Sequence, residues 1–290
     1  MHKGKNIKKF LIFAAIPLSI FFIVLVVPFS QGLFLTFTDW NGFDFNKFVG
    51  LDNYARSFED ERFWATLGFT ASFVVVSIIL TNVVAFSLAL LVTAKLRSAN
   101  IFRTFFFVPN LIGGVILGVI WQFIFNRALV SIAKNYEWPE FFQSSWLNET
   151  DTAFWALIIV TTWQASGYMM IIYITGLMSV EQDVLEAARI DGAGALRTLF
   201  SIKMPLMAQA FTISLFLTLR AGFMAYDVNV ALTGGGPFRT TELISAHIFN
   251  EAFVYGNFDT GQSKAVMMFL IVAIAATVQV AISKRMEVQR

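Results

Sequence analysis

The chain has 290 residues, of which 57% are hydrophobic and 14% are charged, with a net charge of +2 and no cysteine. Soluble domains carry about a quarter charged residues, so this composition excludes an ordinary soluble protein and indicates an integral membrane protein. Without cysteine, disulfides and thiolate metal sites are excluded. The two histidines are His2 and His247. We therefore expect no metal site, and we expect His247 to lie solvated in an outer loop.

Six apolar runs are long enough to cross a membrane as helices, because a hydrocarbon core about 30 Å thick needs roughly 20 apolar residues. In chain order they are Phe10–Leu35, Thr66–Ala94, Thr104–Phe125, Ala153–Met178, Leu206–Tyr226 and Ala265–Ser283. The first run is longer than the ~7–15 apolar residues of a secretion signal, so we expect it to stay in the membrane. The sequence thus predicts an all-α membrane protein with one domain over residues 1–290.

Basic residues are distributed unevenly among the segments that join these runs. Residues 1–9, 95–103, 179–205 and 284–290 hold 13 basic and 5 acidic residues, whereas residues 36–65, 127–152 and 227–263 hold 6 basic and 14 acidic residues. Cytoplasmic loops of membrane proteins carry the excess of lysine and arginine. The first set is therefore predicted to be cytoplasmic, together with both termini, and the second set is predicted to face outward across the cytoplasmic membrane.

A polar segment interrupted by glycine lies in the cytoplasmic set, between the fourth and fifth runs. Helix-forming residues 181–190 are followed by Gly192 and Gly194, and a second helical piece covers residues 195–204. Pro205 then starts the next run, where its missing N–H does no harm. Two short exposed helices joined by a bend are predicted. On composition alone, this segment is an amphipathic connector on the lipid headgroups.

The spacing of particular residues in this segment favours a different interpretation. Glu186-Ala187-Ala188, followed by Gly192, Ile202 and Pro205, resembles the cytoplasmic motif of ABC-importer permeases, with Met204 where leucine is usual. Other stretches resemble permeases of the maltose-type sugar importer family, namely "FVGLDNYARSFEDERFWATLGFT", "RTFFFVPN", "TWQASGYMMIIYITGLMSV" and "LTGGGPFRTTE". The resemblance implies a bundle of six transmembrane helices with the type I ABC importer (MetI-like) fold.

The same resemblance implies one transmembrane subunit of an ATP-driven importer for a sugar, with an oligosaccharide as the expected substrate. It implies a second homologous permease chain, two ATPase subunits that bind ATP and Mg²⁺, and an extracytoplasmic solute-binding protein. No cofactor of this chain and no nucleic acid are expected. The implied ATPase-coupling residues are Glu186, Ala187, Ala188, Asp191 and Gly192. The two alanines would admit a partner surface closely, and the bend at Gly192 would redirect the chain into the membrane.

The chain contains no G-x-x-x-x-G-K-[ST] phosphate loop and no set of residues typical of a nucleophilic or metal-dependent active site. Because the P-loop supplies the phosphate-binding backbone of many ATPases, its absence predicts that the energy comes from a separate subunit. We therefore expect a permease rather than an enzyme. The alternative of an ion-coupled carrier would need acidic residues well inside the runs, and none is found there.

Polar residues in the fourth and fifth runs mark a candidate substrate passage, because polar side chains within a span usually face a cavity or another helix. Thr161, Gln164 and Tyr168 share a helical face, and their hydroxyl, amide and phenol groups suit a sugar. Hydrogen bonding between helices is the alternative. The contact positions that the resemblance implies are these three with Ala165, Thr218, Ala221, Gly222, Ala225 and Asp227.

Arg220 is an unusual residue for the interior of a span. An unpaired guanidinium there would cost about 2.5–3.5 kcal/mol, so it is expected to face a water-filled passage, a carboxylate or the partner permease. An ion pair with another helix is the favoured interpretation. Asp227 would lie about 10 Å away along a continuous helix, which leaves a direct pair only to stretched side chains. The alternative is an anionic substrate, such as a uronate oligosaccharide or glycerol phosphate, held by Arg220.

Two glycine-rich stretches complete the sequence pattern. Gly113, Gly114 and Gly118 in the third run form a surface of small residues, which predicts close packing of another helix. The stretch "TGGGP" at residues 233–237 predicts an outer turn in which glycine adopts positive φ. It serves either as a plain turn or as part of a seat for the substrate-delivery protein.

Overall fold

The computed structural model describes residues 10–94 and 99–285, so the tails and residues 95–98, with their part of the charge pattern, lie outside the described residues. Contacts divide the chain into two compact units. Unit 1 comprises Met1–Phe63 and Ile248–Phe269, and unit 2 comprises Trp64–His247 and Leu270–Arg290. The single-domain organisation predicted for residues 1–290 stays a prediction.

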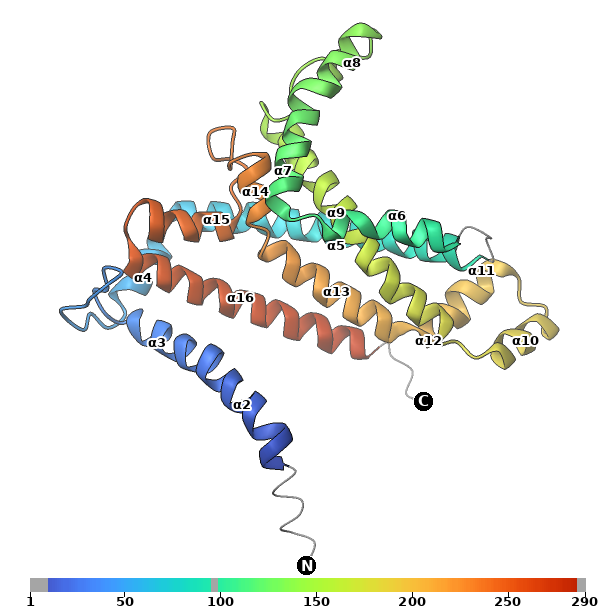
Figure 1. Cartoon of the computed structure of the whole chain (residues 1–290), viewed down its shortest axis with the longest axis horizontal. Coiled ribbons are helices and arrows are strands. Elements are labelled where there is room, and N and C mark those ends of the chain that lie inside the picture. The colour runs from blue at the N-terminus through green and yellow to red at the C-terminus, as the bar shows by residue number, and fades with distance from the viewer. Residues whose placement is uncertain (1–9, 95–98, 286–290) are drawn as a thin grey trace, which may run out of the picture. The chain divides into compact units, whose positions relative to one another are not determined.

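Nearly all of the regular structure in the described residues is helical (Figure 1). Unit 1 contains α2 (Ile16–Phe21), α3 (Val27–Leu35) and α4 (Asp52–Glu59), with π-helical turns at Leu11–Ala15, Phe22–Val26 and Asn250–Val254. Unit 2 contains α6 (Ala99–Leu111), α7 (Gly114–Phe123), α8 (Leu129–Asn135), α9 (Thr150–Met178), α10 (Gln182–Ile190), α11 (Ala195–Thr198), α12 (Met204–Leu206), α13 (Ala208–Phe223) and α14 (Asp227–Leu232), with π-helical turns at Ile124–Ala128 and Leu199–Lys203 and a 3₁₀ turn at Glu140–Phe142. Helices α5 (Glu61–Thr93), α15 (Ile244–Phe249) and α16 (Phe258–Lys284) each begin in one unit and end in the other.

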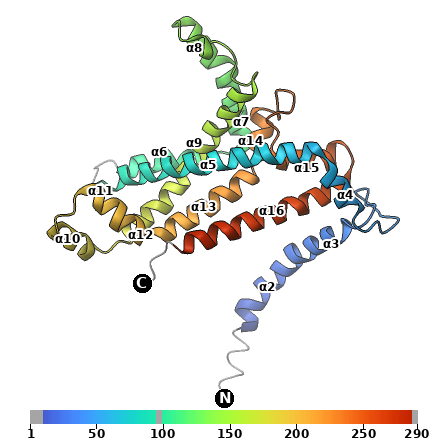
Figure 2. The ribbon, with the colours of Figure 1, turned by 180° about the vertical axis from the view of Figure 1, so that it is seen from behind.

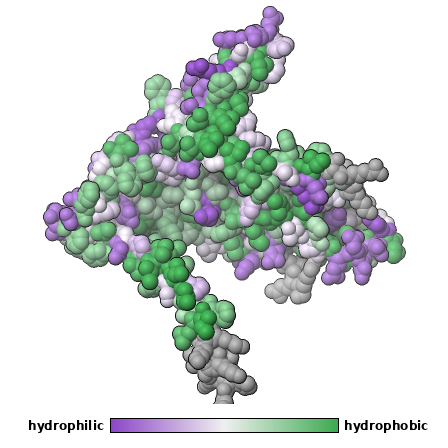
Figure 3. Space-filling view, viewed as in Figure 1, coloured by the Kyte–Doolittle hydropathy of each residue, from purple (hydrophilic) through white to green (hydrophobic). Residues whose placement is uncertain are grey.

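Five helical segments among the described residues are long and apolar enough to cross a membrane, namely Leu11–Leu35, Glu61–Thr93, Gly114–Asn135, Thr150–Met178 and Phe258–Lys284. A sixth is obtained when the bent pair Ala195–Leu206 and Ala208–Phe223 is taken as one span. The predicted all-α membrane fold is therefore confirmed. Figure 3 shows hydrophobic residues over much of the helical surface and hydrophilic residues gathered at α10.

The third predicted run, Thr104–Phe125, is wrong in its bounds. The chain leaves the helix at Ile112 and Gly113, so α6 ends there and the spanning segment is Gly114–Asn135. Gly113 is extended, with φ −59° and ψ 141°, and the side-chain amide of Gln164 donates to the Ile112 carbonyl at 3.0 Å. A hydrogen bond from another helix thus satisfies a backbone group that the break would otherwise leave unpaired.

Helices α5, α9 and α13 meet in the apolar core of unit 2, where Ala85, Met170 and Ala210 are buried. Four polar side chains lie at this junction, and we name them the polar node: Asn82, Tyr173, Ser214 and Thr218. Tyr173 Oη donates to Asn82 Oδ1 at 2.7 Å, Ser214 Oγ also donates to Asn82 Oδ1, and Asn82 Nδ2 donates to Thr218 Oγ1 at 3.0 Å. The node therefore joins three helices through the carboxamide of one asparagine.

The segment between α9 and α13 has the predicted pair of short helices with a glycine bend. Gly192 has φ +77°, and the Ala193 N–H closes the end of α10 by donating to the Ala188 carbonyl at 2.9 Å. A second bend, of 71°, follows between Leu206 and Ala208. The expectation that the bend at Gly192 redirects the chain into the membrane stays a prediction.

In unit 1, polar contacts join α4 to residues of the C-terminal half of the chain. Lys264 Nζ donates to Asp60 at 2.6 Å and to Glu251 at 2.9 Å, and Arg56 pairs with Asp259 at 2.6 Å. In the loop after α3, the backbone N–H groups of Lys47 and Asn46 donate to the Asp39 carboxylate and hold its pKa below the ordinary value. The first third of the sequence is thereby tied to residues some 200 positions later.

The expectation of a solvated His247 is wrong. This side chain is 2% exposed and lies in α15. Its neighbours Leu243, Ile244 and Ala246 are also buried, so residues that resemble an outer loop in composition form a packed helix. No apolar run around His247 is long enough to indicate that burial.

Candidate substrate passage and coupling helix

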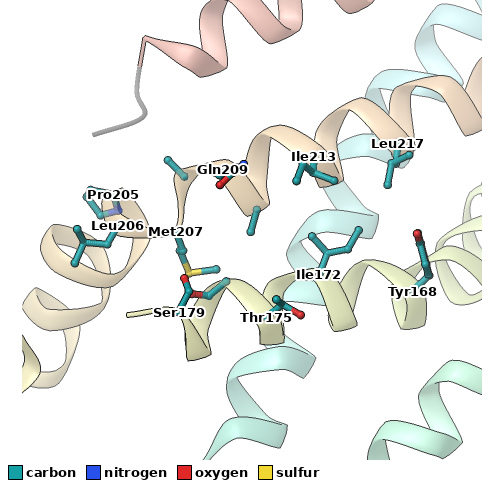
Figure 4. A pocket seen from close by; sticks show the side chains of 13 residues that line it. Tyr168, Ile172, Thr175, Ser179, Pro205, Leu206, Met207, Gln209, Ile213 and Leu217 are labelled. Atoms are coloured by element: carbon teal, nitrogen blue, oxygen red, sulfur yellow. The ribbon is translucent and has the colours of Figure 1, made fainter. Parts of the chain in front are cut away.

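Two cavities lie along the contact between α9 and α13 in unit 2. The larger has a volume of about 610 Å³ and is lined by Tyr168, Ile172, Thr175, Gly176 and Ser179 of α9 and its C-terminal end and by residues 205–210, Ile213 and Leu217 (Figure 4). The smaller has a volume of about 270 Å³. The larger cavity is lined by the C-terminal end of α9 and the N-terminal end of α13, and the segment that contains α10 joins these two ends. The larger cavity therefore lies closer to α10 than the smaller one does.

The smaller cavity, here called the passage pocket, brings together most of the predicted passage residues. From that prediction it is lined by Thr161, Gln164, Ala165, Thr218, Ala221, Gly222, Ala225 and Asp227. They come from α9, from α13 and from the segment that leads into α14. Residues that are more than 50 positions apart in the sequence therefore share one concave surface. Which of them contact substrate stays a prediction.

Helix α5 contributes Phe73, Ser77 and Thr81 to the same pocket, and sequence reasoning missed all three. Ser77 Oγ is buried and has no hydrogen-bond partner among residues 10–94 and 99–285. The three residues recur at a spacing of four, so they lie on one helical face. That spacing within an apolar run was the signal that could have identified them.

Tyr168 lines the larger cavity rather than the passage pocket. Figure 4 shows it at one end of that cavity, directed from α9 toward Leu217 on α13, while Ser179 and Met207 lie at the other end. The face that Tyr168 shares with Thr161 and Gln164 thus runs through both cavities. The two cavities follow each other along the same pair of helices.

Three polar side chains of the passage pocket already donate protons to other groups of the protein. Thr161 donates its proton to the Leu157 carbonyl at 2.7 Å, and Gln164 donates its amide N–H to Ile112. Thr218 donates to the Ser214 carbonyl at 2.6 Å. The side-chain oxygens of Thr161 and Gln164, together with the Asp227 carboxylate, remain to accept hydrogen bonds, whereas Thr218 Oγ1 already accepts one from Asn82. Such a surface suits neutral molecules with many hydroxyl groups, and the hydrogen bonds between helices that were the alternative interpretation are present as well.

Arg220 lines neither cavity and is exposed on α13. No ion pair of Arg220 occurs in the described part of the chain, so its expected partner on another helix is not among these residues. Helix α13 ends at Phe223 and Asp227 begins α14. Arg220 and Asp227 therefore lie on different helices, whereas the sequence suggested one continuous helix.

Helix α14 packs closely on α7 through two of the predicted small residues. A Cβ at Gly118 would lie 2.5 Å from Ala231 Cβ, and a Cβ at Gly114 would lie 2.8 Å from Asp227 Cβ. Close packing at the glycine surface is therefore confirmed. Gly113 meets nothing within 4 Å, and its role is in the break between α6 and α7.

The predicted coupling residues lie on and just after α10, which is at the end of unit 2 remote from α7 and α14 in both ribbon views (Figures 1 and 2). Glu186, Ala187, Asp191 and Gly192 are exposed, whereas Ala188 is buried. Ile190, at the end of the helix, is 87% exposed. Of the alanine pair, Ala187 alone is open to a partner surface, and Ile190 adds an apolar contact that the sequence did not single out.

Membrane-spanning helices around a partly polar pocket, with an exposed polar helix in the segment that joins two of the helices lining it, are the features of a membrane permease subunit. Comparison with known proteins identifies the family to which this permease subunit belongs. Residues 82–288 match the family described as "Binding-protein-dependent transport system inner membrane component". This match covers well over half of the chain, and the chain belongs to that family.

Curated relatives and solved structures agree with the assignment. The chain is 44% identical over 280 residues to a probable starch degradation products transport system permease protein, AmyD, of Thermoanaerobacterium thermosulfurigenes, covering 96% of this chain and 94% of the relative. It is 31% identical over 277 residues to a multiple sugar-binding transport system permease protein, MsmF, of Streptococcus mutans serotype c, covering 95% of both. A chain from the crystal structure of a bacterial ABC transporter that imports the acidic polysaccharide alginate has the same fold, with a TM-score of 0.84 at 17% identity over 98% of this chain and 99% of that one. This protein is therefore a membrane-embedded permease subunit of a binding-protein-dependent transport system.

Proposed function

We propose that this chain pairs with a second homologous permease chain and that two ATPase subunits, which bind ATP and Mg²⁺, receive α10 on the cytoplasmic side, where both termini also lie. An extracytoplasmic solute-binding protein delivers the sugar. The family description names a binding-protein-dependent system. The segment that contains α10 belongs to the set of connecting segments that together hold 13 basic and 5 acidic residues, which supports its cytoplasmic position.

The observation that carries the proposal is the place of α10 in the chain. It connects α9 to α13, and these two helices line both cavities. A partner that displaces α10 therefore acts directly on the helices around the passage. A ligand shifts such an equilibrium only through different contacts in the two states. Glu186, Ala187 and Ile190 are the exposed groups that would make those contacts.

The substrate class follows from the lining of the pocket. Neither cavity is lined by lysine or arginine among the described residues, and the passage pocket carries the Asp227 carboxylate. An anionic sugar would meet repulsion there, whereas hydroxyl donors of a neutral oligosaccharide would find acceptors. The relative with 44% identity is described as a permease for starch degradation products. We therefore favour a neutral oligosaccharide of that kind over a uronate oligosaccharide or glycerol phosphate. Membership of an ABC importer family leaves the ion-coupled carrier without support.

The test uses the complete importer reconstituted in liposomes, with Glu186→Arg as the variant and Glu181→Arg as its control. Both glutamates are exposed, but Glu181 lies before α10. We expect Glu186→Arg to weaken ATPase association and uptake of a neutral malto-oligosaccharide about tenfold, equivalent to about 1.4 kcal/mol, and Glu181→Arg to leave both near wild type. Equal effects of the two variants would refute the coupling role of α10.

A further inference from the structure

The loop between α14 and α15 presents one aromatic side chain to its surroundings. Phe238 is 97% exposed, more than any other large hydrophobic side chain in the part of the chain that the structure describes. Its neighbours in the sequence, Thr233–Pro237 and Arg239–Glu242, are glycine, proline, threonine and charged residues. A single phenylalanine therefore stands on a polar loop rather than within an apolar surface.

The backbone at this position adopts a conformation that side chains disfavour. Phe238 has φ +50° and Arg239 has φ +61°, and Glu137 is the one other non-glycine residue with positive φ among those described. Bulky residues avoid this region because Cβ approaches the backbone. Two such residues in succession persist only where the surrounding structure holds them, and such positions occur preferentially at functional sites.

Several hydrogen bonds hold the loop in this shape. The guanidinium of Arg239 donates to both oxygens of the buried Glu242 carboxylate, at 2.8 and 2.7 Å. Thr240 Oγ1 lies 2.8 Å from Thr150 Oγ1 at the start of α9. Asn229 of α14 donates to the Thr241 carbonyl at 2.8 Å. The exposed ring is thus carried by a rigid support within unit 2.

Helix α14 connects this loop to the passage pocket. Helix α14 begins with Asp227 and Val228, which line that pocket, and ends at Leu232, directly before the loop. Its other side packs on α7 through Gly118. One short helix therefore connects the loop to the wall of the pocket.

We propose that Phe238 is the anchor through which the solute-binding protein docks, its ring entering an apolar depression on that protein. This proposal rests on the proposed function, which places the loop on the outer side. Interfaces derive most of their binding energy from a few aromatic or arginine anchors surrounded by polar contacts that exclude water, and a preformed support removes the entropy cost of ordering the anchor. A lipid contact would favour a broader apolar surface, which the flanking threonine, glycine and charged residues do not provide.

The absence of cysteine from the chain permits a direct test. Phe238→Cys, labelled with an environment-sensitive fluorophore before assembly of the importer in nanodiscs, is titrated with the solute-binding protein that stimulates ATP hydrolysis by the unmodified importer. The matched control is Phe43→Cys, because Phe43 is 91% exposed in the loop after α3. We expect a blue shift at position 238 and none at position 43. A shift produced by nanodiscs alone, before the binding protein is added, would identify a lipid contact and overturn the proposal.

Affinity provides the second measurement. Phe238→Ala is expected to weaken binding of the same protein at least about tenfold, as loss of an anchor does, and Glu242→Gln is expected to weaken it severalfold by loosening the support. Phe43→Ala should leave the affinity unchanged. Unchanged binding in Phe238→Ala, or an equal loss in Phe43→Ala, would refute the anchor. Binding of the solute-binding protein to the wild-type importer on the face that carries α10 would instead refute the proposed function.

Discussion

The two ends of unit 2 carry similar sequence features and are built differently. Both are polar, glycine-containing segments next to α13. The hydrogen bonds of α10 and its C-terminal turn are local, from Asp191, Gly192 and Ala193 back into the same helix. The loop after α14 instead bonds to Thr150 of α9, and Ile244 N–H donates to Thr70 of α5 at 2.9 Å. No side-chain hydrogen bond joins α10 to another long helix among the described residues.

This difference has a mechanical meaning. A helix that makes no side-chain hydrogen bond to another helix can follow the partner that binds it, whereas a cross-bonded loop keeps one shape and presents it to a partner. The first suits an element that must move between two states, and the second suits a preorganised docking surface. Helix α13 connects them, since it follows the bend at Met207 and leads to Asp227 of α14.

The largest effect is expected at Gly192, which shapes the turn after α10. We call α10 and this turn the movable end of unit 2. In Gly192→Val, the left-handed φ of +77° is no longer accessible without strain of about 1–3 kcal/mol. We expect the turn to reorganise and ATP-dependent uptake to fall about tenfold or more, because about 1.4 kcal/mol corresponds to a factor of ten. Uptake by liposomes and ATPase association are the measurements.

Gly194→Val is the matched control for that change. Gly194 has φ −67°, and neither glycine has any atom within 4 Å of its Cβ position. The two variants add the same volume to the same open space, so only the backbone conformation distinguishes them. Similar losses of uptake in both would show that the segment tolerates no side chain there and would remove the role assigned to the bend.

A smaller effect is expected from a change at the other end of unit 2, where α14 and the loop after it are cross-bonded, and we call this the fixed end. The effect should appear in the free energy of unfolding as well as in transport. Gly118→Leu places a side chain where Ala231 Cβ already lies, 2.5 Å from the new Cβ. Overpacking of this kind costs about 1–3 kcal/mol, and α14 must shift away from α7. We expect a lower thermal unfolding temperature of the purified importer together with weaker binding of the solute-binding protein.

Gly113→Leu serves as the comparison, since Gly113 meets nothing within 4 Å and is already in an extended conformation with φ −59°. Its unfolding temperature should stay close to that of the wild type. If Gly118→Leu unfolded normally and bound normally, the connection from loop to pocket through α14 would have to be abandoned.

Sequence patterns predicted what depends on local chemistry. The bend at Gly192, the small-residue contact at Gly118 and four of the six spans follow from properties of a few neighbouring residues. The break at Ile112 did not follow, because the apolar run is continuous and the stabilising amide comes from Gln164, 52 positions away. The burial of His247 and the bend at Met207 were missed for the same reason.

The passage was predicted in composition but not in shape. Thr161 and Gln164 were singled out as polar residues in a span and Thr218 as a position implied by the family resemblance, and all three line one pocket. Which groups remain free to accept a hydrogen bond depends on partners such as Leu157 and Asn82. Those partners are seen only in the three-dimensional arrangement. Ser77 also lines the pocket, although α5, the helix that carries it, was not predicted to contribute to the passage.

The smallest effect is expected from Tyr173→Phe at the polar node, which lies between the two ends of unit 2. Tyr173→Phe removes one hydrogen bond to Asn82, and buried side-chain hydrogen bonds in membrane proteins contribute about 0.6 kcal/mol on average. Asn82→Leu removes the bonds to Tyr173, Ser214 and Thr218 together and leaves three hydroxyls without their partner, so we expect a loss of about 1–3 kcal/mol. Unfolding of the purified chain is the measurement.

A double-mutant cycle decides whether the node acts as one unit. If Tyr173 and Ser214 both depend on the same Asn82 oxygen, then combining Tyr173→Phe with Ser214→Ala should give a loss that differs from the sum of the single losses by about 0.5 kcal/mol or more, as is found for residues in one network. Strict additivity would mean that the helices α9 and α13 contact α5 independently. In that case a displacement at α10 would reach α9 and α13 separately, and the node would not link the movable end to the fixed one.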